Sequence, residues 1–239
     1  GFTALKFDPV EPVTVQAPYQ LSLKRLENAE KVAGAVREAV GDKCDLLIGT
    51  HGEMTTSSAI RLAKRLEKYD PLWLEEPVPP ENRDEMARVA RHTSIPIATG
   101  ERLSTKYEFR ELLEKQAAQI LQFPLGRVGG ILEAKKIAGM AEAYYAQIAP
   151  HLYAGPIEAI ANIQIDTCSP NFLIQESIET WGGFYTEILK EPIKWEEGSI
   201  IPPDKPGLGI ELNEEVVEKY IYTGTGTALD VRYGHLYDY

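Results

Sequence analysis

The sequence predicts an α/β protein whose parallel strands, each followed by a helix, close into a barrel. Short apolar runs typical of buried strands alternate with helix-like segments, at a spacing of roughly 25–30 residues. Such repeats imply right-handed crossovers and a parallel sheet. The 239 residues, 44% of them hydrophobic, can fill the core of one barrel, although length alone also allows two small domains.

Seven strands are expected. Each is a short apolar run, and the proline at position 96 stands near the start of its run, where a missing ladder donor matters least. A closed barrel of this type has eight strands, so we expect one strand to be irregular or to lie upstream of Gly1. The seven runs are residues 3–7, 45–48, 72–74, 95–98, 119–122, 146–149 and 172–174.

Helices are expected between these strands. Apolar and small side chains recur with a helical period in residues 22–40. The helix over 55–67 opens with Thr-Thr-Ser-Ser, which is rich in capping groups. Further helices are predicted over 81–91, 105–115, 129–144 and 156–167, whereas residues 177–222 are loop-rich.

Composition excludes several classes of function. The chain has 25 Lys and Arg against 36 Asp and Glu, a formal charge of −11, and no basic stripe, which argues against a nucleic-acid partner. An anionic substrate would therefore need a local cation. No apolar run approaches the length of a membrane span and no signal peptide is recognised, so a cytoplasmic protein is expected.

Two glutamates and a histidine stand where apolar runs end. Glu75 follows one run and Glu101 follows the next, which would place both carboxylates at the carboxyl-end mouth of a barrel. Oxygen ligands of this kind suit Mg²⁺. His151 ends a later run and could serve as a base. A surface glutamate or a structural histidine is the alternative at each position.

Several motifs occur in a fixed order along most of the chain. These motifs are Gly1–Pro9, Glu75–Pro77, Ala98–Glu101, Arg127–Ala134, Ala149–Pro156, Gln175–Glu176 and Pro206–Ile210. With them the chain resembles the enolase superfamily, in its mandelate racemase-like branch, and most closely the galactonate dehydratase-like sugar-acid dehydratases.

The resemblance implies a TIM-type (β/α)7β barrel preceded by an α+β capping domain. The chain looks like that barrel from its second strand through its eighth, over residues 1–178. We expect the capping domain and the first barrel strand to be lacking. The loop-rich segment 179–239 is expected to pack on the barrel or to complete the cap region.

The resemblance also implies one Mg²⁺ held by acidic groups at the ends of strands three, four and five. Glu75 and Glu101 match the second and third of these, but the first falls on Gly49, which offers no side-chain ligand. His51 and Glu53 lie on the same loop, and Asp45 is roughly 13 Å too far toward the barrel bottom. The ion would then be held by two carboxylates with His51 or water, or would be lost.

Two histidines match catalytic groups of the resembled family. His151 matches the general base at the end of strand seven. The carboxylate that usually orients it is replaced by Pro124, so we predict a lowered pKa for His151 and a poorer base. His51 matches the acid that protonates the departing hydroxyl.

Four more residues are assigned to the site, and two of them, Lys6 and Glu176, match residues of the resembled family. Lys6 would neutralise a substrate carboxylate, or act as a base if its pKa were depressed, or form an ion pair with Asp8 or Glu75. Glu176 would hydrogen-bond the enolate oxygen, either while protonated or through shared protons. Arg102 and Asp8 are assigned to substrate binding, with Arg102 alternatively balancing the acidic cluster. Glu76 is expected on the other side of its strand, in a structural ion pair.

The predicted function is an Mg²⁺-dependent lyase that dehydrates a sugar acid through a metal-stabilised enediolate. The alternatives are a racemase or epimerase of the mandelate racemase type, and a catalytically impaired barrel fragment. The expected partners are a small carboxylate substrate and further copies of the chain in a homo-oligomer.

Overall fold

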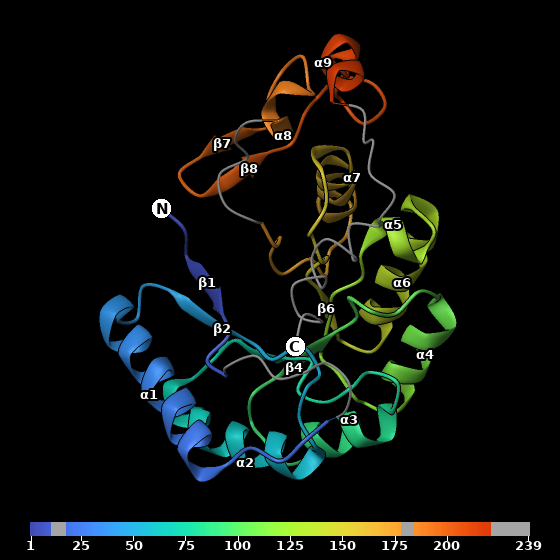
Figure 1. The fold of residues 1–239 in the computed structure, drawn as a ribbon. Helices are drawn as coiled ribbons and strands as arrows, with labels where there is room; N and C mark the ends of the chain where they lie inside the picture. Colours follow the sequence, from blue (N-terminus) through green and yellow to red (C-terminus); the bar gives the residue numbers. More distant parts are fainter. Residues whose placement is uncertain (11–17, 178–183, 221–239) are drawn as a thin grey trace.

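A parallel sheet forms the centre of the molecule (Figure 1). The computed structural model describes residues 1–10, 18–177 and 184–220. Six parallel strands are hydrogen-bonded in sequence order, which is the arrangement expected of consecutive βα units. They are β1 (Ala4–Phe7), β2 (Asp45–Gly49), β3 (Trp73–Glu75), β4 (Ile97–Thr99), β5 (Ile120–Leu121) and β6 (Gln147–Ile148).

The seventh predicted strand lies beside β6. Phe172 forms a parallel bridge with Ile148, and the backbone N–H of Leu173 donates to the carbonyl of Ile148 at 2.9 Å. All seven predicted runs therefore lie in the sheet in the predicted order. An eighth strand upstream of Gly1 stays a prediction.

The helices between the strands pack along the outer side of the sheet (Figure 1). Four of them begin at a side-chain cap, provided by Ser22, Thr55, Asn82 and Thr105, as their capping chemistry favours. The helices up to the seventh predicted strand are α1 (Leu23–Val40), α2 (Thr56–Leu66) with a 3-10 turn (Glu67–Tyr69), α3 (Arg83–Ala90), α4 (Lys106–Glu114), α5 (Leu125–Val128), α6 (Ile131–Ala143) and α7 (Pro156–Thr167).

The helix predicted over 129–144 is α6, which begins at Ile131 rather than at residue 129, and the short helix α5 precedes it. Gly129 and Gly130 separate them with φ of 101° and 85°. These values lie in the left-handed region that glycine adopts without steric cost, so the pair forms a turn rather than the first turn of a helix.

Two apolar clusters lie on opposite faces of the sheet. The larger one joins the sheet to the surrounding helices and includes Leu62, Phe109 and Phe123. The smaller one occupies the inner side, with Leu47 and Trp73 among its members. This smaller cluster also includes residues from β4, β5 and the chain after β6, as expected of side chains that fill a barrel interior.

The segment after the seventh predicted strand adds a small layer. Residues 184–220 contain α8 (Phe184–Glu187), the antiparallel hairpin of β7 (Lys194–Glu196) and β8 (Ser199–Ile201), and α9 (Glu214–Lys219). Its Trp195 ring meets the Phe2 ring edge-on at 6.3 Å, and Gln164 of α7 donates to the Leu208 carbonyl. The closing part of the predicted 179–239 segment lies outside the described residues, and the division at 178 stays a prediction.

Among the described residues, no helix combines the length and apolar character needed to cross a bilayer.

Candidate functional site

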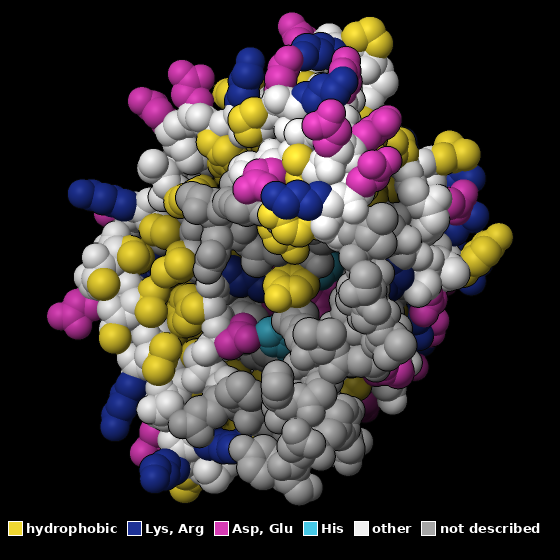
Figure 2. Space-filling view, turned by 45° about the horizontal axis from the view of Figure 1, so that its top comes forward, with side chains coloured by type: hydrophobic (Ala, Val, Ile, Leu, Met, Phe, Trp, Pro, Cys, Tyr) yellow, Lys and Arg dark blue, Asp and Glu magenta, His cyan; other side chains and the backbone are white. Residues whose placement is uncertain are grey.

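Five of the predicted site residues meet at the carboxyl ends of the strands. Lys6 lies in β1 and Glu75 ends β3, while Glu101, His151 and Glu176 follow later strand ends. Figure 2 shows acidic, basic and histidine side chains gathered around a hollow at the centre of the face it presents. The sequence pattern predicted this convergence.

A continuous series of contacts links these five side chains. The Lys6 Nζ lies 2.6 Å from a carboxylate oxygen of Glu75 and 2.6 Å from one of Glu176. The other Glu176 oxygen lies 2.7 Å from His151 Nδ1, which is also 3.6 Å from Glu101 Oε2. Charges of both signs therefore alternate across the cluster.

Glu75 is almost fully buried at the centre of the cluster, with 4% of its surface exposed. Its second oxygen accepts hydrogen bonds from the indole of Trp73 at 3.0 Å and from the amide of Gln122 at 2.8 Å. Neither donor was predicted from the sequence. Gln122 was nevertheless visible as a polar residue that ends an apolar strand.

Lys6 is held as a cation. Burial by itself would lower the pKa of Lys6, but the carboxylates of Glu75 and Glu176 raise it above the ordinary lysine value. The base role considered for Lys6 required a depressed pKa, so this arrangement does not provide it. The predicted ion pair with Glu75 is confirmed, and Glu176 is an additional partner that the sequence did not indicate.

The predicted lowering of the His151 pKa is wrong. Burial does act in that direction, but contact with Glu176 and the charge of Glu101 raise the pKa of His151 above its ordinary value. The prediction considered only the position after β5, where Pro124 stands. The orienting carboxylate comes instead from Glu176, which follows the seventh predicted strand at residues 172–174.

Glu176 is ionised rather than protonated. Burial would raise its pKa, but His151 and Lys6 outweigh burial and lower the pKa of Glu176 to about 2. The backbone N–H of Leu152 also donates to it at 2.7 Å. Of the two possibilities considered for Glu176, the protonated carboxyl is therefore wrong for this arrangement, and a role through shared protons stays a prediction.

Asp8 and His51 form a second pair, between the ends of β1 and β2. His51 Nδ1 lies 3.1 Å from Asp8 Oδ2, and both side chains are about two-fifths exposed. Contact with Asp8 raises the pKa of His51 to about 9, although burial opposes the rise. His51 is therefore a cation at neutral pH in this arrangement, as a proton donor must be.

Gly49 lies beside this pair. A Cβ added at Gly49 would lie only 2.0 Å from Asp8 Oδ1. The space that a side chain at position 49 would need is therefore already occupied by the Asp8 carboxylate. A glycine is required there as long as Asp8 keeps this position.

Glu76 makes the structural ion pair that was predicted for it. It is 1% exposed, and its carboxylate accepts from Arg102 Nε at 2.6 Å and from the Thr99 hydroxyl at 3.2 Å. Burial raises the pKa of Glu76 to about 7, against the opposing charge of Arg102. Arg102 thus balances a buried carboxylate, and its role in substrate binding stays a prediction.

Removal of Arg102 is expected to destabilise the fold. Arg102→Met would leave the Glu76 carboxylate buried without its cation, which costs about 3 kcal/mol or more of unfolding free energy. Urea unfolding at pH 8 measures the loss. The control is Arg110→Met, which removes an exposed i,i+4 pair with Glu114 and is expected to cost about 1 kcal/mol at most. Equal effects of the two variants would contradict this assignment.

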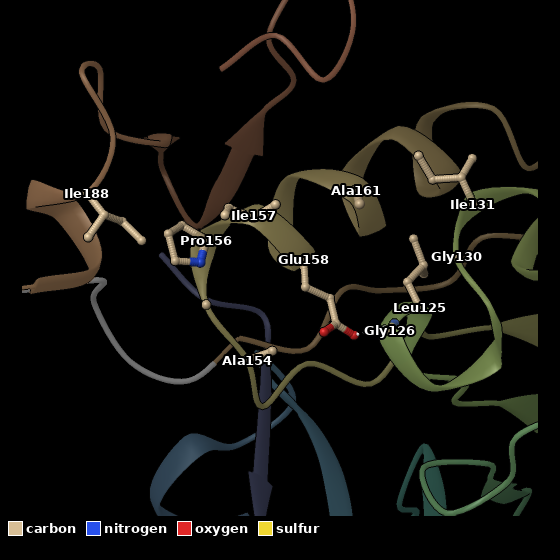
Figure 3. A pocket seen from close by; sticks show the side chains of 11 residues that line it. Leu125, Gly126, Gly130, Ile131, Ala154, Pro156, Ile157, Glu158, Ala161 and Ile188 are labelled. Atoms are coloured by element: carbon tan, nitrogen blue, oxygen red, sulfur yellow. Dashed lines mark hydrogen bonds between the residues drawn. The ribbon is translucent and has the colours of Figure 1, made fainter. Parts of the chain in front are cut away.

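A separate apolar pocket of about 390 Å³ lies away from the charged cluster. Leu125, Ile131, Pro156, Ile157 and Ile188 line it, and Glu158 at its edge accepts from the Gly126 N–H at 3.0 Å (Figure 3). None of the predicted site residues lines this pocket. The charged cluster remains the candidate site, because its lysine, histidine and carboxylates can take part in proton transfer, whereas the lining of this pocket is mainly apolar.

The acidic side chains suit a hard cation, but they are paired as they stand. Within residues 1–10, 18–177 and 184–220, no three His, Cys, Asp or Glu side chains are close enough together to hold a metal. Glu75 is bound by Lys6, Glu101 lies near His151, and Asp8 is paired with His51. The donor chemistry fits Mg²⁺, since all three acidic groups present carboxylate oxygens at the strand ends.

Comparison with known proteins places the chain in a family. Residues 1–216 match the family model described as enolase C-terminal domain-like. The chain is 38% identical to the D-xylonate dehydratase of Haloferax volcanii and 35% identical to the D-gluconate/D-galactonate dehydratase of Picrophilus torridus. Each match covers 94% of this chain, but only 55% and 56% of those proteins, so the chain spans about half of their length.

A solved structure gives the same result. A crystal structure from Burkholderia SAR-1, of the mandelate racemase/muconate lactonizing enzyme type, is 64% identical and superposes with a TM-score of 0.92. The match covers 95% of this chain and 56% of that one. The chain therefore belongs to the enolase superfamily, as a barrel domain of its mandelate racemase-like, galactonate dehydratase-like branch.

Proposed function

We propose that the protein is a lyase that removes water from a sugar acid in an Mg²⁺-dependent reaction. The main support is the linked cluster of Lys6, Glu75, Glu176, His151 and Glu101 at the strand ends. The names of the two archaeal relatives point to aldonic acids as the substrate class.

Glu75 and Glu101 are the proposed metal-binding residues. The ion would supply positive charge for the substrate carboxylate and for the negative charge that develops on it. Lys6, held as a cation at the same mouth, would add a second positive charge toward that carboxylate.

His151 is the proposed base. Its Nδ1 faces Glu176, which leaves Nε2, in the neutral imidazole, to take the proton from C2 of the sugar acid. Glu176 fixes the ring and stabilises the imidazolium that results. In the triad of serine hydrolases an aspartate has the corresponding role toward a histidine.

His51 is the proposed acid. Asp8 holds its Nδ1, so Nε2 can give a proton to the hydroxyl that leaves C3. The hydroxyl departs as water, the C3–O bond breaks and a C2–C3 double bond forms. The resulting enol becomes a 2-keto-3-deoxy acid, so the substrate loses one water and no oxidant is needed.

A panel of sugar acids tests the proposal. D-xylonate, D-gluconate, D-galactonate and the corresponding hexarates would be incubated with the protein and Mg²⁺, and 2-keto acid would be measured as its semicarbazone. We expect product from at least one aldonate, and none after Glu101→Gln. Formation of an epimer without 2-keto acid would favour the racemase alternative. Neither product from any sugar acid would support the impaired-fragment reading.

A further inference from the structure

The register of the strands shows which residues lie beside Gly49 in the sheet. Gly49 is paired with Glu75 across β2 and β3, and Phe7 is paired with Ile48 across β1 and β2. Asp8 is therefore the next residue beside Gly49. Paired residues of neighbouring parallel strands face the same side, so Asp8, position 49 and Glu75 lie in one row at the mouth.

The missing side chain at position 49 is compensated from the neighbouring strand. Asp8 Oδ1 lies 2.0 Å, and its Cγ 3.2 Å, from the point where a Cβ of residue 49 would be. A carboxylate is thus present in the row next to Glu75, although its backbone belongs to the strand one place over. Gly49 and Asp8 are sterically a matched pair.

The two oxygens of Asp8 have different surroundings. His51 Nδ1 holds Oδ2 at 3.1 Å, whereas Oδ1 is the oxygen in the space beside Gly49. Carboxylates that bind metals are commonly held by a hydrogen bond of this kind on their other side. About two-fifths of the Asp8 side chain is exposed, so a solvated cation can reach it.

We propose that Asp8 is the third carboxylate ligand of the cation site, in place of a side chain at position 49. The inference rests on the proposed function, because that function supplies the cation. It assigns Asp8 to the metal rather than to the substrate, and it assigns His51 the further role of fixing the Asp8 carboxylate.

Cation binding can be measured without turnover. Tb³⁺ binds oxygen ligands and emits when excited through a nearby indole, and Trp73 Nε1 lies 3.0 Å from Glu75 Oε2. We expect Tb³⁺ emission from the full chain that Mg²⁺ competes away. Asp8→Asn is expected to weaken binding at least about tenfold, the lower end of the loss seen when even an outer-shell partner is removed.

A swap of the two residues separates ligation from a structural role. In the double variant Asp8→Gly with Gly49→Asp, the carboxylate moves to β2 and the obstructing one is removed. We expect the swap to regain most of the affinity lost in Asp8→Asn. A role of Asp8 limited to its ion pair with His51 would leave the swap as weak as the single variant, and would overturn the inference.

Two further variants distinguish failure of the inference from failure of the proposed function. Asp45→Asn, at the exposed start of β2, is the matched control and is expected to bind like the parent protein. Glu101→Gln tests the site itself. Unchanged affinity in Asp8→Asn together with loss in Glu101→Gln would overturn the role of Asp8 and leave the function standing. Absence of Mg²⁺-competed emission from the parent protein would overturn both.

Discussion

Replacing His151 with Asn is expected to lower kcat for sugar-acid dehydration by about 10²–10⁴-fold, the usual contribution of a positioned acid or base. Asn keeps a polar side chain of similar reach but cannot accept and return a proton. The ring follows β6 and lies between the Glu176 and Glu101 carboxylates, at 2.7 and 3.6 Å from its Nδ1. Steady-state formation of 2-keto acid measures the effect.

A second measurement separates loss of the base from loss of folding. Exchange of the C2 proton with deuterated solvent, followed by NMR, should disappear in His151→Asn while the melting temperature stays close to that of the parent. His92→Asn is the matched control, because His92 is exposed in the turn after α3 and its Nδ1 lies 2.8 Å from the Arg88 carbonyl. A loss of activity below tenfold would mean that another group removes the proton.

Most of the fold could be read from the sequence because its signals are local. Apolar runs, capping residues and helical periods fix each βα unit separately, and parallel order follows from their alternation. The helix predicted from residue 129 begins at Ile131, because Gly129 and Gly130 have positive φ and form a turn. The short helix α5 before that turn was not predicted.

The residues of the candidate site could be predicted from the sequence, but the contacts between their side chains could not. Strand ends placed Glu75, Glu101 and His151 at one mouth. The contacts of Glu176 with Lys6 and His151 join residues far apart in sequence, and no local pattern encodes them. The predicted lowering of the His151 pKa was wrong because the contact of His151 with Glu176 could not be foreseen from the sequence.

The same limit applies at Gly49. When only the strand that contains Gly49 is considered, the glycine indicates that a metal ligand has been lost. The structure shows that the neighbouring strand supplies a carboxylate to the same space. With Asp8 as the proposed third ligand, the ligand set would be a property of the row across the sheet, which cannot be read along one strand of the sequence.

Asp166 leads to the second large expected effect, on stability. It lies in α7 and is 8% exposed, and neither of its carboxyl oxygens has a hydrogen-bond partner among the described residues. Burial raises the pKa of Asp166 from its ordinary value of 3.8 to about 8. The folded protein therefore keeps this carboxyl protonated at pH values where the unfolded chain has released the proton.

The direction of the pH dependence follows from this difference. Between about pH 4 and pH 8 the folded state binds one proton more than the unfolded state, so the free energy of unfolding falls as pH rises. A tenfold change in proton affinity is worth about 1.4 kcal/mol, so the rise in the pKa of Asp166 from 3.8 to about 8 sets an upper limit of roughly 6 kcal/mol for the fall. The contribution is complete below pH 4 and lost by about pH 8.

Asp166→Asn should remove this dependence, because the amide has nearly the same shape and never ionises. We expect the variant to match the parent at pH 4 and to exceed it by up to several kcal/mol of unfolding free energy at pH 8. Urea unfolding at both pH values measures the difference, with Asp42→Asn in an exposed turn as the control. If the parent and Asp166→Asn curves ran parallel from pH 4 to pH 8, the carboxyl would have a partner outside the described residues that keeps it ionised. The buried acid would then be half of an ion pair.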